Sequence, residues 1–192
     1  YYPEMGAAAV RWKDYSMLLA EMGHDVTVIC ERPNYPLGKI YSGYKHFFIE
    51  KHPNYNHTVI RTWAIINQRS TFFQRIMCYT SFMISSFFAG IQLPKADMYL
   101  VSSPPLFAGI TGYILSILRK TPLIFDIRDL WPETAIELGE LNSWFSRRIG
   151  FYMQYLIYRQ SSVFIVPVPG MGDYIRKNKY INRKPILTLM NG

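Results

Sequence analysis

The segment FDIRDLWPE, Phe125 to Glu133, gathers charged side chains at the end of a run that otherwise has the pattern of a buried strand. Asp126 alternates with apolar residues, Arg128 and Asp129 follow at the expected strand end, and Glu133 comes after a Trp-Pro pair. Ionisable groups in such a place are costly unless they pair or contact something outside the protein. Two interpretations therefore stay open. One is a ligand site, and the other is a structural Arg128–Asp129 pair with Glu133 in the first turn of a helix, where acids are favoured.

Two further segments place small or polar residues just before a helix. In YYPEMGAAAVRW, Met5, Gly6 and Ala7 precede or open a helix that also carries Arg11, and small residues there let backbone N–H groups approach a phosphate. The segment matches neither GxGxxG nor a Walker loop, so its spacing alone favours an ordinary helix start. In VSSPPLFAG, Ser102 or Ser103 is placed to cap the next helix, and Ser103 at a strand end is also a candidate ligand contact.

The hydrophobic periodicity predicts strands that alternate with helices, which is typical of an α/β fold with a mainly parallel sheet. In such sheets ligands bind outside the carboxyl ends of the strands, where the clusters ERPNYP, SSPP, RDLWPE and PVPG all fall. The expected helices are 7–22, 70–97, 106–120, 143–159 and a short one over 169–178, and the expected strands are 25–30, 57–65, 97–105, 122–129, 161–168 and 184–192.

Composition narrows the class of protein. The chain has 192 residues, 49% of them hydrophobic, and a formal charge of +8, which suits phosphate-bearing or anionic partners as well as a merely soluble basic surface. Cys30 and Cys78 show no metal-binding spacing, so two reduced thiols are expected. The stretch from Ile76 to Leu93 carries no charge. We expect it to be a buried crossover helix or a helix that lies in the membrane plane, rather than a membrane span, because serine, threonine and glutamine interrupt it.

Together, the segments YYPEMGAAAVRW, GHDVTVIC, SSPP, FDIRDLWPE and ILTLMNG resemble the N-terminal lobe of a GT-B glycosyltransferase of the family 4 type. The bacterial enzymes that add N-acetylated amino sugars during O-antigen or capsule synthesis are the most similar. The resemblance implies a Rossmann-like sheet with helices on both faces. It also implies that residues 1–192 form an acceptor-side lobe whose first strand is missing, and that a donor-binding C-terminal lobe lies outside this chain.

The resemblance also implies roles for individual residues. Met5, Gly6 and Ala7 match a loop that approaches the donor diphosphate, although this family often has Gly-Gly where Ala7 stands. Arg128 and Asp129 match a catalytic position that usually reads His-Asp. An arginine cannot act as a base at neutral pH but can bind phosphate or a sugar carboxylate. Asp129 and Glu133 are then expected to bind acceptor hydroxyls or to orient Arg128. Arg11 and Ser103 complete the expected substrate-binding set.

The implied reaction is a retaining transfer of a sugar from a nucleotide donor, expected to be UDP-linked, to a polyprenyl-diphosphate-linked sugar. It takes place at the cytoplasmic face of the bacterial plasma membrane, without a metal or another cofactor. A non-catalytic, membrane-docking subunit of a split glycosyltransferase is the main alternative. A nucleotide-binding oxidoreductase lacks its GxGxxG here, and a nucleic-acid binder lacks a basic stripe interleaved with aromatic residues.

Overall fold

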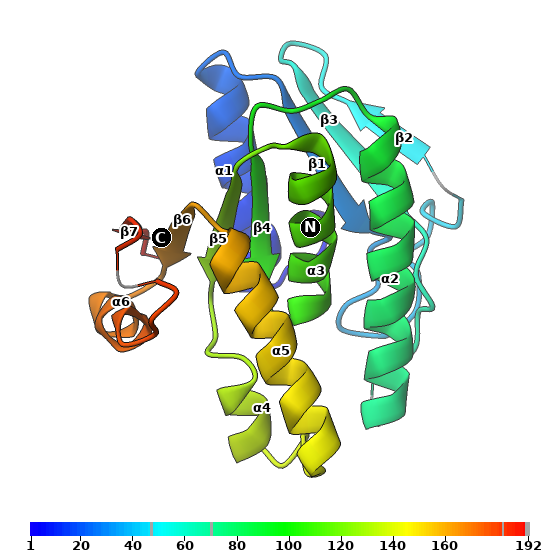
Figure 1. Ribbon diagram of the computed structural model, residues 1–192. Coiled ribbons are helices and arrows are strands. Elements are labelled where there is room, and N and C mark those ends of the chain that lie inside the picture. Colours follow the sequence, from blue (N-terminus) through cyan, green and yellow to red (C-terminus); the bar gives the residue numbers. More distant parts are fainter. Residues whose placement is uncertain (47, 70, 182, 191–192) are drawn as a thin grey trace. The chain divides into compact units, whose positions relative to one another are not determined.

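The computed structural model describes residues 1–46, 48–69, 71–181 and 183–190. The described chain forms two compact units, Tyr1–Gln92 and Leu93–Met190. Each unit contains its own β-sheet with helices packed against it (Figure 1). The α/β class is confirmed, whereas the sequence analysis expected a single sheet and the described chain has two.

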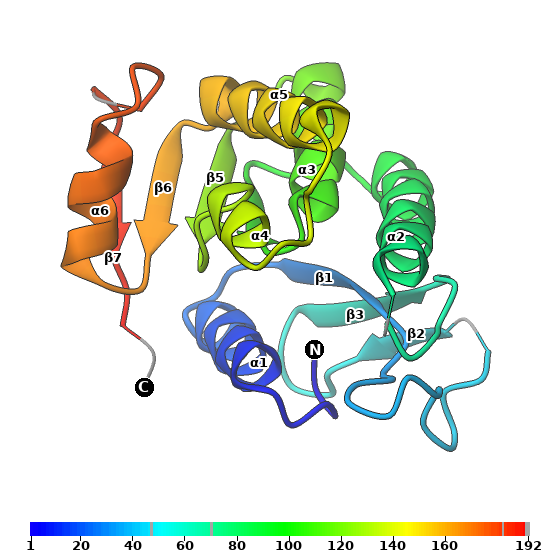
Figure 2. The same cartoon turned by 90° about the horizontal axis from the view of Figure 1, so that it is seen from below.

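The first unit is built on a three-stranded sheet in the order β1-β3-β2. Its elements are α1 (Ala7–Glu21), β1 (Val26–Glu31), β2 (Phe48–Lys51), β3 (His57–Thr62) and α2 (Phe72–Gln92). Strands β1 and β3 are parallel, whereas β2 is an antiparallel edge strand that the sequence analysis did not anticipate. Both helices pack against β1 and β3, and Figure 2 shows these strands between them. Burial of almost every residue of β3 is what a strand covered on both faces requires.

Helix α2 is the expected apolar helix, although residue 70, the first of the predicted range, lies outside the described residues. Its small and polar residues face inward: Ser81 is buried and its Oγ accepts from the Ile65 N–H at 2.8 Å, and Ser85 Oγ donates to the Trp63 carbonyl. An apolar stripe faces outward, with the exposed side chains of Phe73, Ile84 and Phe88. Among the described residues, no helix has the length and apolar character needed to cross a bilayer.

The second unit is built on a parallel four-stranded sheet in the order β4-β5-β6-β7. Its elements are β4 (Tyr99–Ser103), α3 (Leu106–Arg119), β5 (Leu123–Ile127), α4 (Glu133–Glu137), α5 (Trp144–Gln160), β6 (Val163–Val166), α6 (Pro169–Arg176) and β7 (Ile186–Thr188). These match the predicted elements, except that α4 was anticipated only as a helix start at Glu133 and was given no range. Residues 191–192 of the last expected strand lie outside the described part of the chain.

Helices α3 and α5 lie side by side against this parallel sheet, and α6 packs on β6 and β7 (Figure 1). Phe125, Tyr158 and Phe164 form the centre of the core, with Tyr158 edge-on to both phenylalanine rings at centroid distances of 6.1 and 5.4 Å. Such edge-to-face pairs add about 0.5–1.5 kcal/mol each beyond the area that they bury. Through Tyr158, the core thereby anchors α5 against β5 and β6.

Candidate active site

The first acid of the FDIRDLWPE segment has a structural partner. Asp126 is fully buried in β5 and lies opposite Ser102 of β4 in the parallel register. Ser102 Oγ donates to Asp126 Oδ2 at 2.7 Å. A buried carboxylate needs such donors, so Asp126 belongs to the sheet interior rather than to the ligand-facing set.

The next two charged residues lie where the chain leaves the sheet. The Arg128 N–H donates to the Ser103 carbonyl at 3.1 Å, which extends the β4–β5 ladder past Ile127, and a turn follows in which the Trp131 N–H donates to the Asp129 carbonyl. Arg128 is half-buried and Asp129 is exposed. Within the described ranges, neither side chain makes an ion pair or a hydrogen bond with the protein, so the structural Arg128–Asp129 pair is not formed. Both groups are available to a ligand at the carboxyl end of β5.

Glu133 begins α4, as predicted, but it does not cap the helix. Pro132 is the N-cap residue, without a side-chain capping bond. The Glu133 carboxylate instead accepts from Gln154 Nε2 of α5, at 3.1 and 3.3 Å to its two oxygens. The same Nε2 donates to the Trp131 carbonyl at 2.8 Å. Gln154 therefore fastens the loop after β5 to α5.

The backbone of α5 passes close to the Pro132 ring at Gly150, which keeps the loop after β5 near this helix. A Cβ placed on Gly150 of α5 would lie 2.8 Å from Pro132 Cβ, closer than real Cβ contacts come. Only glycine lets α5 pass so near to the Trp-Pro turn that leads to Glu133. The position of Glu133 thus depends on a residue that the sequence analysis did not single out.

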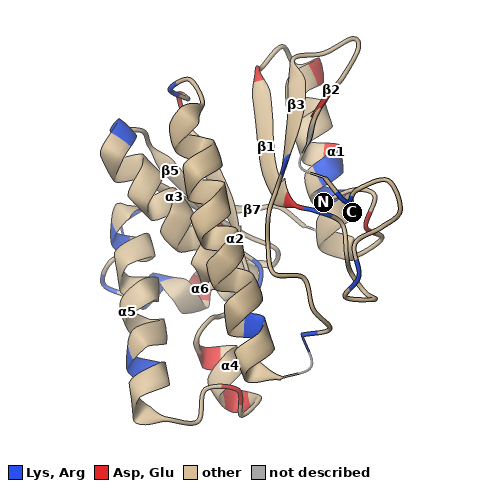
Figure 3. Cartoon of the chain, turned by 90° about the vertical axis from the view of Figure 1, so that its right-hand side faces the viewer, with Lys and Arg blue, Asp and Glu red and all other residues tan. Residues whose placement is uncertain are grey.

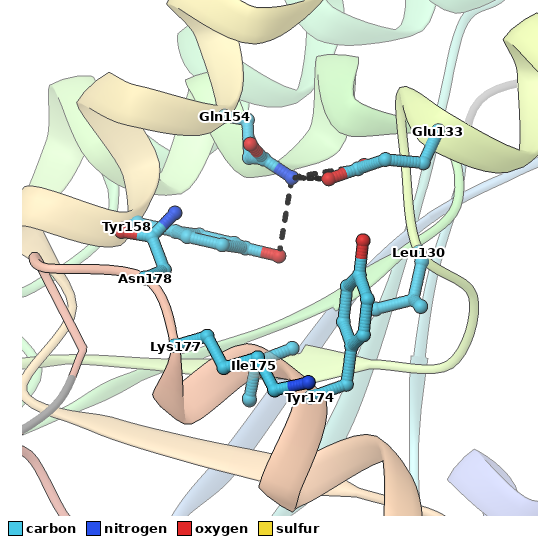
Figure 4. Close-up of a pocket in the computed structure, with 8 residues that line it drawn as sticks. All are labelled: Leu130, Glu133, Gln154, Tyr158, Tyr174, Ile175, Lys177 and Asn178. Atoms are coloured by element: carbon cyan, nitrogen blue, oxygen red, sulfur yellow. Dashed lines mark hydrogen bonds between the residues drawn. The ribbon is translucent and has the colours of Figure 1, made fainter.

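A partly open pocket of about 260 Å³ lies beside Glu133 (Figure 4). It is lined by Leu130, Glu133, Gln154, Tyr158, Tyr174, Ile175, Lys177 and Asn178. Of these residues, the sequence analysis identified only Glu133. Leu130 comes from the loop after β5, and the others come from α5, from α6 and from the segment just after α6. The available signal was the PVPG cluster after β6, which leads directly into the helix that carries Tyr174.

The two tyrosines of the pocket differ in their surroundings. Tyr158 is buried in the core, and Tyr174 is 47% exposed on α6. Burial raises the pKa of the Tyr158 phenol well above its ordinary value, and the Glu133 carboxylate raises it further. Tyr158 therefore keeps its proton at any physiological pH and acts as a neutral hydrogen-bonding group.

The SSPP segment does not cap a helix through a serine. The N-cap of α3 is Pro105, and no side-chain bond caps this helix, so the capping prediction for Ser102 and Ser103 is wrong. Ser102 is engaged with Asp126, and Ser103 is buried. In the described part of the chain, Ser103 Oγ has no hydrogen-bond partner. A buried hydroxyl without a partner at a strand end is consistent with a ligand contact.

In the first unit, the expected phosphate-facing loop leads into α1. Gly6 is its N-cap residue, with extended backbone and no side-chain capping bond, and Met5 is 88% exposed. Glu4 holds the loop in place, because its Oε1 accepts from the Asn34 and Tyr35 N–H groups at 2.7 and 2.8 Å. Ala7 is exposed at the start of the helix. The backbone of 5–7 thus lies at the positive end of α1, where an anion is favoured.

Arg11 lies farther along α1 and is only 7% exposed. Its guanidinium lies over the Tyr15 ring, 5.2 Å from the centroid. The side chain is therefore largely buried within the first unit. Gly6 and Ala7 present backbone to the surface, whereas Arg11 does not present its charge there.

Parallel strands with a charged loop and a polar pocket at their carboxyl ends are typical of α/β proteins that bind nucleotides and sugars. The comparison with protein families is more specific: residues 6–192 match the model of the glycosyl transferase 4-like domain. The chain belongs to this family. No curated protein matches the chain closely enough to count as a relative.

Proposed function

We propose that this chain is the acceptor-side lobe of a retaining glycosyltransferase of cell-surface polysaccharide synthesis. The donor is a nucleotide sugar, UDP-linked and carrying an N-acetylated amino sugar, and the acceptor is a sugar on a polyprenyl diphosphate. Family membership supports glycosyl transfer. The donor, the acceptor, the retaining course and a separate donor-binding lobe rest on the sequence resemblance.

The structural observation that supports the proposal is the position of Arg128 and Asp129. Arg128 and Asp129 leave the carboxyl end of β5 without a protein partner among the described residues, next to Glu133 and its pocket. Asp129 is exposed and Arg128 is half-buried, so both charged groups are free to pair with a ligand at this end of the sheet. In the proposed site Arg128 binds the phosphate or sugar that carries developing negative charge, and Asp129 accepts a hydrogen bond from an acceptor hydroxyl or orients Arg128.

The loop of Met5, Gly6 and Ala7 is proposed to approach the donor diphosphate through the α1 N-terminus, with Ser103 as a further substrate contact. Helix ends and basic groups stabilise the leaving diphosphate, so the proposal needs no metal.

Substitutions at the strand end test this role. We expect Arg128→Lys and Asp129→Asn each to lower glycosyl transfer by about 10²-fold or more, the loss typical of removing one group that stabilises developing charge. Asp97→Asn is the matched control, because Asp97 is exposed and lies just before β4, at the amino ends of the strands rather than at their carboxyl ends. Equal transfer by all three variants and the unsubstituted protein would reject the assignment of Arg128 and Asp129.

Calorimetry tests the assignment of the lobe. UDP is titrated into this chain and into a protein that joins it to a C-terminal donor-binding lobe. The proposal expects tight binding only by the two-lobe protein. Tight binding of UDP by this chain alone would contradict the acceptor-side role.

Helix α2 supports a peripheral membrane location as part of the same proposal. Its outward stripe of Phe73, Ile84 and Phe88 is apolar, and Figure 3 shows no acidic residue along the helix. A chain of formal charge +8 is attracted to anionic headgroups. We expect co-sedimentation with vesicles of phosphatidylglycerol and phosphatidylcholine, and its loss in Phe73→Ser/Phe88→Ser. Unchanged sedimentation of that variant would reject α2 as the contact.

The same stripe also favours the second candidate, a membrane-docking subunit without catalytic residues of its own. The two candidates differ in what Arg128 does. If vesicle binding requires α2, while Arg128→Lys leaves transfer by the assembled enzyme unchanged, the docking subunit is the better description.

A further inference from the structure

The pocket beside Glu133 has a lining that matches the chemistry of a sugar ring. Its side chains include two phenols, a carboxylate, two amides and one ammonium group, with Leu130 and Ile175 as the apolar members. Its volume of about 260 Å³ lies just below the range of roughly 300–1,000 Å³ that is typical of small-molecule sites. The space therefore suits one compact, hydroxyl-rich ring rather than a nucleotide or an extended chain.

Charge argues against an anionic occupant. Among the described residues of the lining, Lys177 is the one base and Glu133 is the one acid, so the two formal charges cancel. The Lys177 ammonium group also lies near the Tyr174 ring, 6.0 Å from its centroid. A diphosphate needs several donors or cations, which this lining does not offer. A neutral ligand with many hydroxyl groups fits the balance.

The walls of the pocket are held in place before any ligand arrives. Gln154 Nε2 joins Glu133 and the Trp131 carbonyl, and it lies 3.5 Å from the Tyr158 hydroxyl. Tyr158 itself is packed between Phe125 and Phe164 in the core. Such preorganisation lowers the entropy cost of binding a polar ligand.

Tyr174, the more exposed of the two tyrosines, gives the pocket an aromatic surface. In Figure 4 the hydroxyl groups of Tyr158 and Tyr174 point toward the same space below Glu133. The Tyr174 ring is half-exposed on α6 and lines the pocket, where an aromatic surface can contact ligand C–H groups, and the Glu133 and Tyr158 side chains beside it can bind hydroxyls.

From this combination we infer that the pocket of Glu133, Tyr158, Tyr174 and Lys177 is a saccharide subsite, which holds one neutral pyranose ring of the acceptor. The assignment to the acceptor rests on the proposed function, whereas the assignment to a sugar rests on the lining alone. Tyr174 is the stacking platform, Glu133 accepts from ring hydroxyls, and Lys177 and Asn178 donate at the rim.

Ligand-observed NMR provides the first test, with N-acetylglucosamine, N-acetylgalactosamine and glucose as probes and inorganic phosphate as the anionic comparison. We expect saturation transfer from the protein to at least one sugar, undiminished by phosphate. Tyr174→Ala should weaken binding of that sugar by about tenfold, in the range of a lost aromatic contact, and Tyr174→Phe should weaken it less. Lys177→Ala should weaken it several-fold.

Matched controls come from the same two segments. Tyr152 is an exposed tyrosine of α5, and Lys179 is an exposed lysine just after α6, and neither lines the pocket. Tyr152→Ala and Lys179→Ala should bind the sugar as the unsubstituted protein does. Binding of none of the three sugars, or equal binding by Tyr174→Ala and the controls, would overturn the inference.

A transfer assay separates this inference from the proposed function. If the protein transfers sugar and Tyr174→Ala leaves KM for the acceptor unchanged, the acceptor subsite is wrong and the transferase stands. If Tyr174→Ala weakens sugar binding as expected but the protein that joins this chain to a donor-binding lobe turns over no nucleotide sugar, the saccharide pocket stands and the proposed function is wrong.

Discussion

Ser102 and Asp126 lie opposite each other on the neighbouring strands β4 and β5, joined by a hydrogen bond of 2.7 Å that satisfies a fully buried carboxylate. The charged residues of the FDIRDLWPE segment therefore differ in role. Asp126 serves the sheet, and Arg128 and Asp129, beyond the strand end, remain available at the surface.

Removal of the serine hydroxyl should destabilise the second unit. Hydrogen bonds to charged groups contribute about 1.5–3 kcal/mol, so we expect Ser102→Ala to lower the free energy of unfolding by that amount. Urea denaturation measures the change. Ser162→Ala, at an exposed serine before β6, should leave the midpoint where it is. Equal midpoints for both variants would show that Asp126 is satisfied without Ser102.

Gly150 should be intolerant of even a methyl group. In Gly150→Ala the new Cβ would meet the Pro132 ring at 2.8 Å, and overpacking of this kind costs about 1–3 kcal/mol. The shift would also move Glu133, so sugar binding should weaken along with stability. At Gly170 of α6 an added Cβ would meet no atom within 4 Å, so Gly170→Ala tests the helical preference alone and should be neutral or stabilising. Thermal unfolding of both variants provides the comparison.

Acidification should destabilise the first unit through His57. This imidazole is buried, with its Nε2 3.0 Å from Ser16 Oγ, and burial lowers its pKa below the ordinary value of 6.5, with a smaller contribution from His52. Below about pH 6.5 the unfolded chain binds a proton that the folded chain resists, so stability falls as the pH is lowered through this range. His57→Gln should flatten the pH dependence between about pH 7 and pH 5, measured by urea unfolding. His24→Gln, at an exposed site, should not.

Cys30 should be inert to thiol reagents in the folded protein. Burial raises its pKa to about 11, and its Sγ lies 3.2 Å from the Arg61 guanidinium inside the first unit. Because the thiolate is the reactive form, labelling by iodoacetamide at about pH 8 should be slower than in urea by at least about 10²-fold. Mass spectrometry identifies the labelled residue. Rapid labelling of native Cys30 would mean that β1 opens to solvent.

The sequence predicted most of the fold, because most of its elements have strong periodicity. Helix α3 and strand β5 follow their patterns closely, whereas β2 is a four-residue edge strand whose pairing with β3 depends on tertiary contacts rather than on its own pattern. For the site, the strand-end rule located Arg128, Asp129 and Glu133. It could not locate Gln154 or Tyr174, because their role comes from the packing of α5 and α6 beside the loop after β5. The outward apolar stripe of α2 likewise depends on which face meets β3.

The side-chain amide of Gln154 has fewer hydrogens than it has neighbouring polar groups. Its Nε2 carries two hydrogens, and three groups lie within 3.5 Å of it: the Trp131 carbonyl, the Glu133 carboxylate and the Tyr158 hydroxyl. The short bond to the Trp131 carbonyl takes one of these hydrogens, so Glu133 receives at most one hydrogen from Gln154. A carboxylate has about four acceptor sites. Glu133 therefore keeps acceptor capacity that a hydroxyl, from water or from a ligand, can fill.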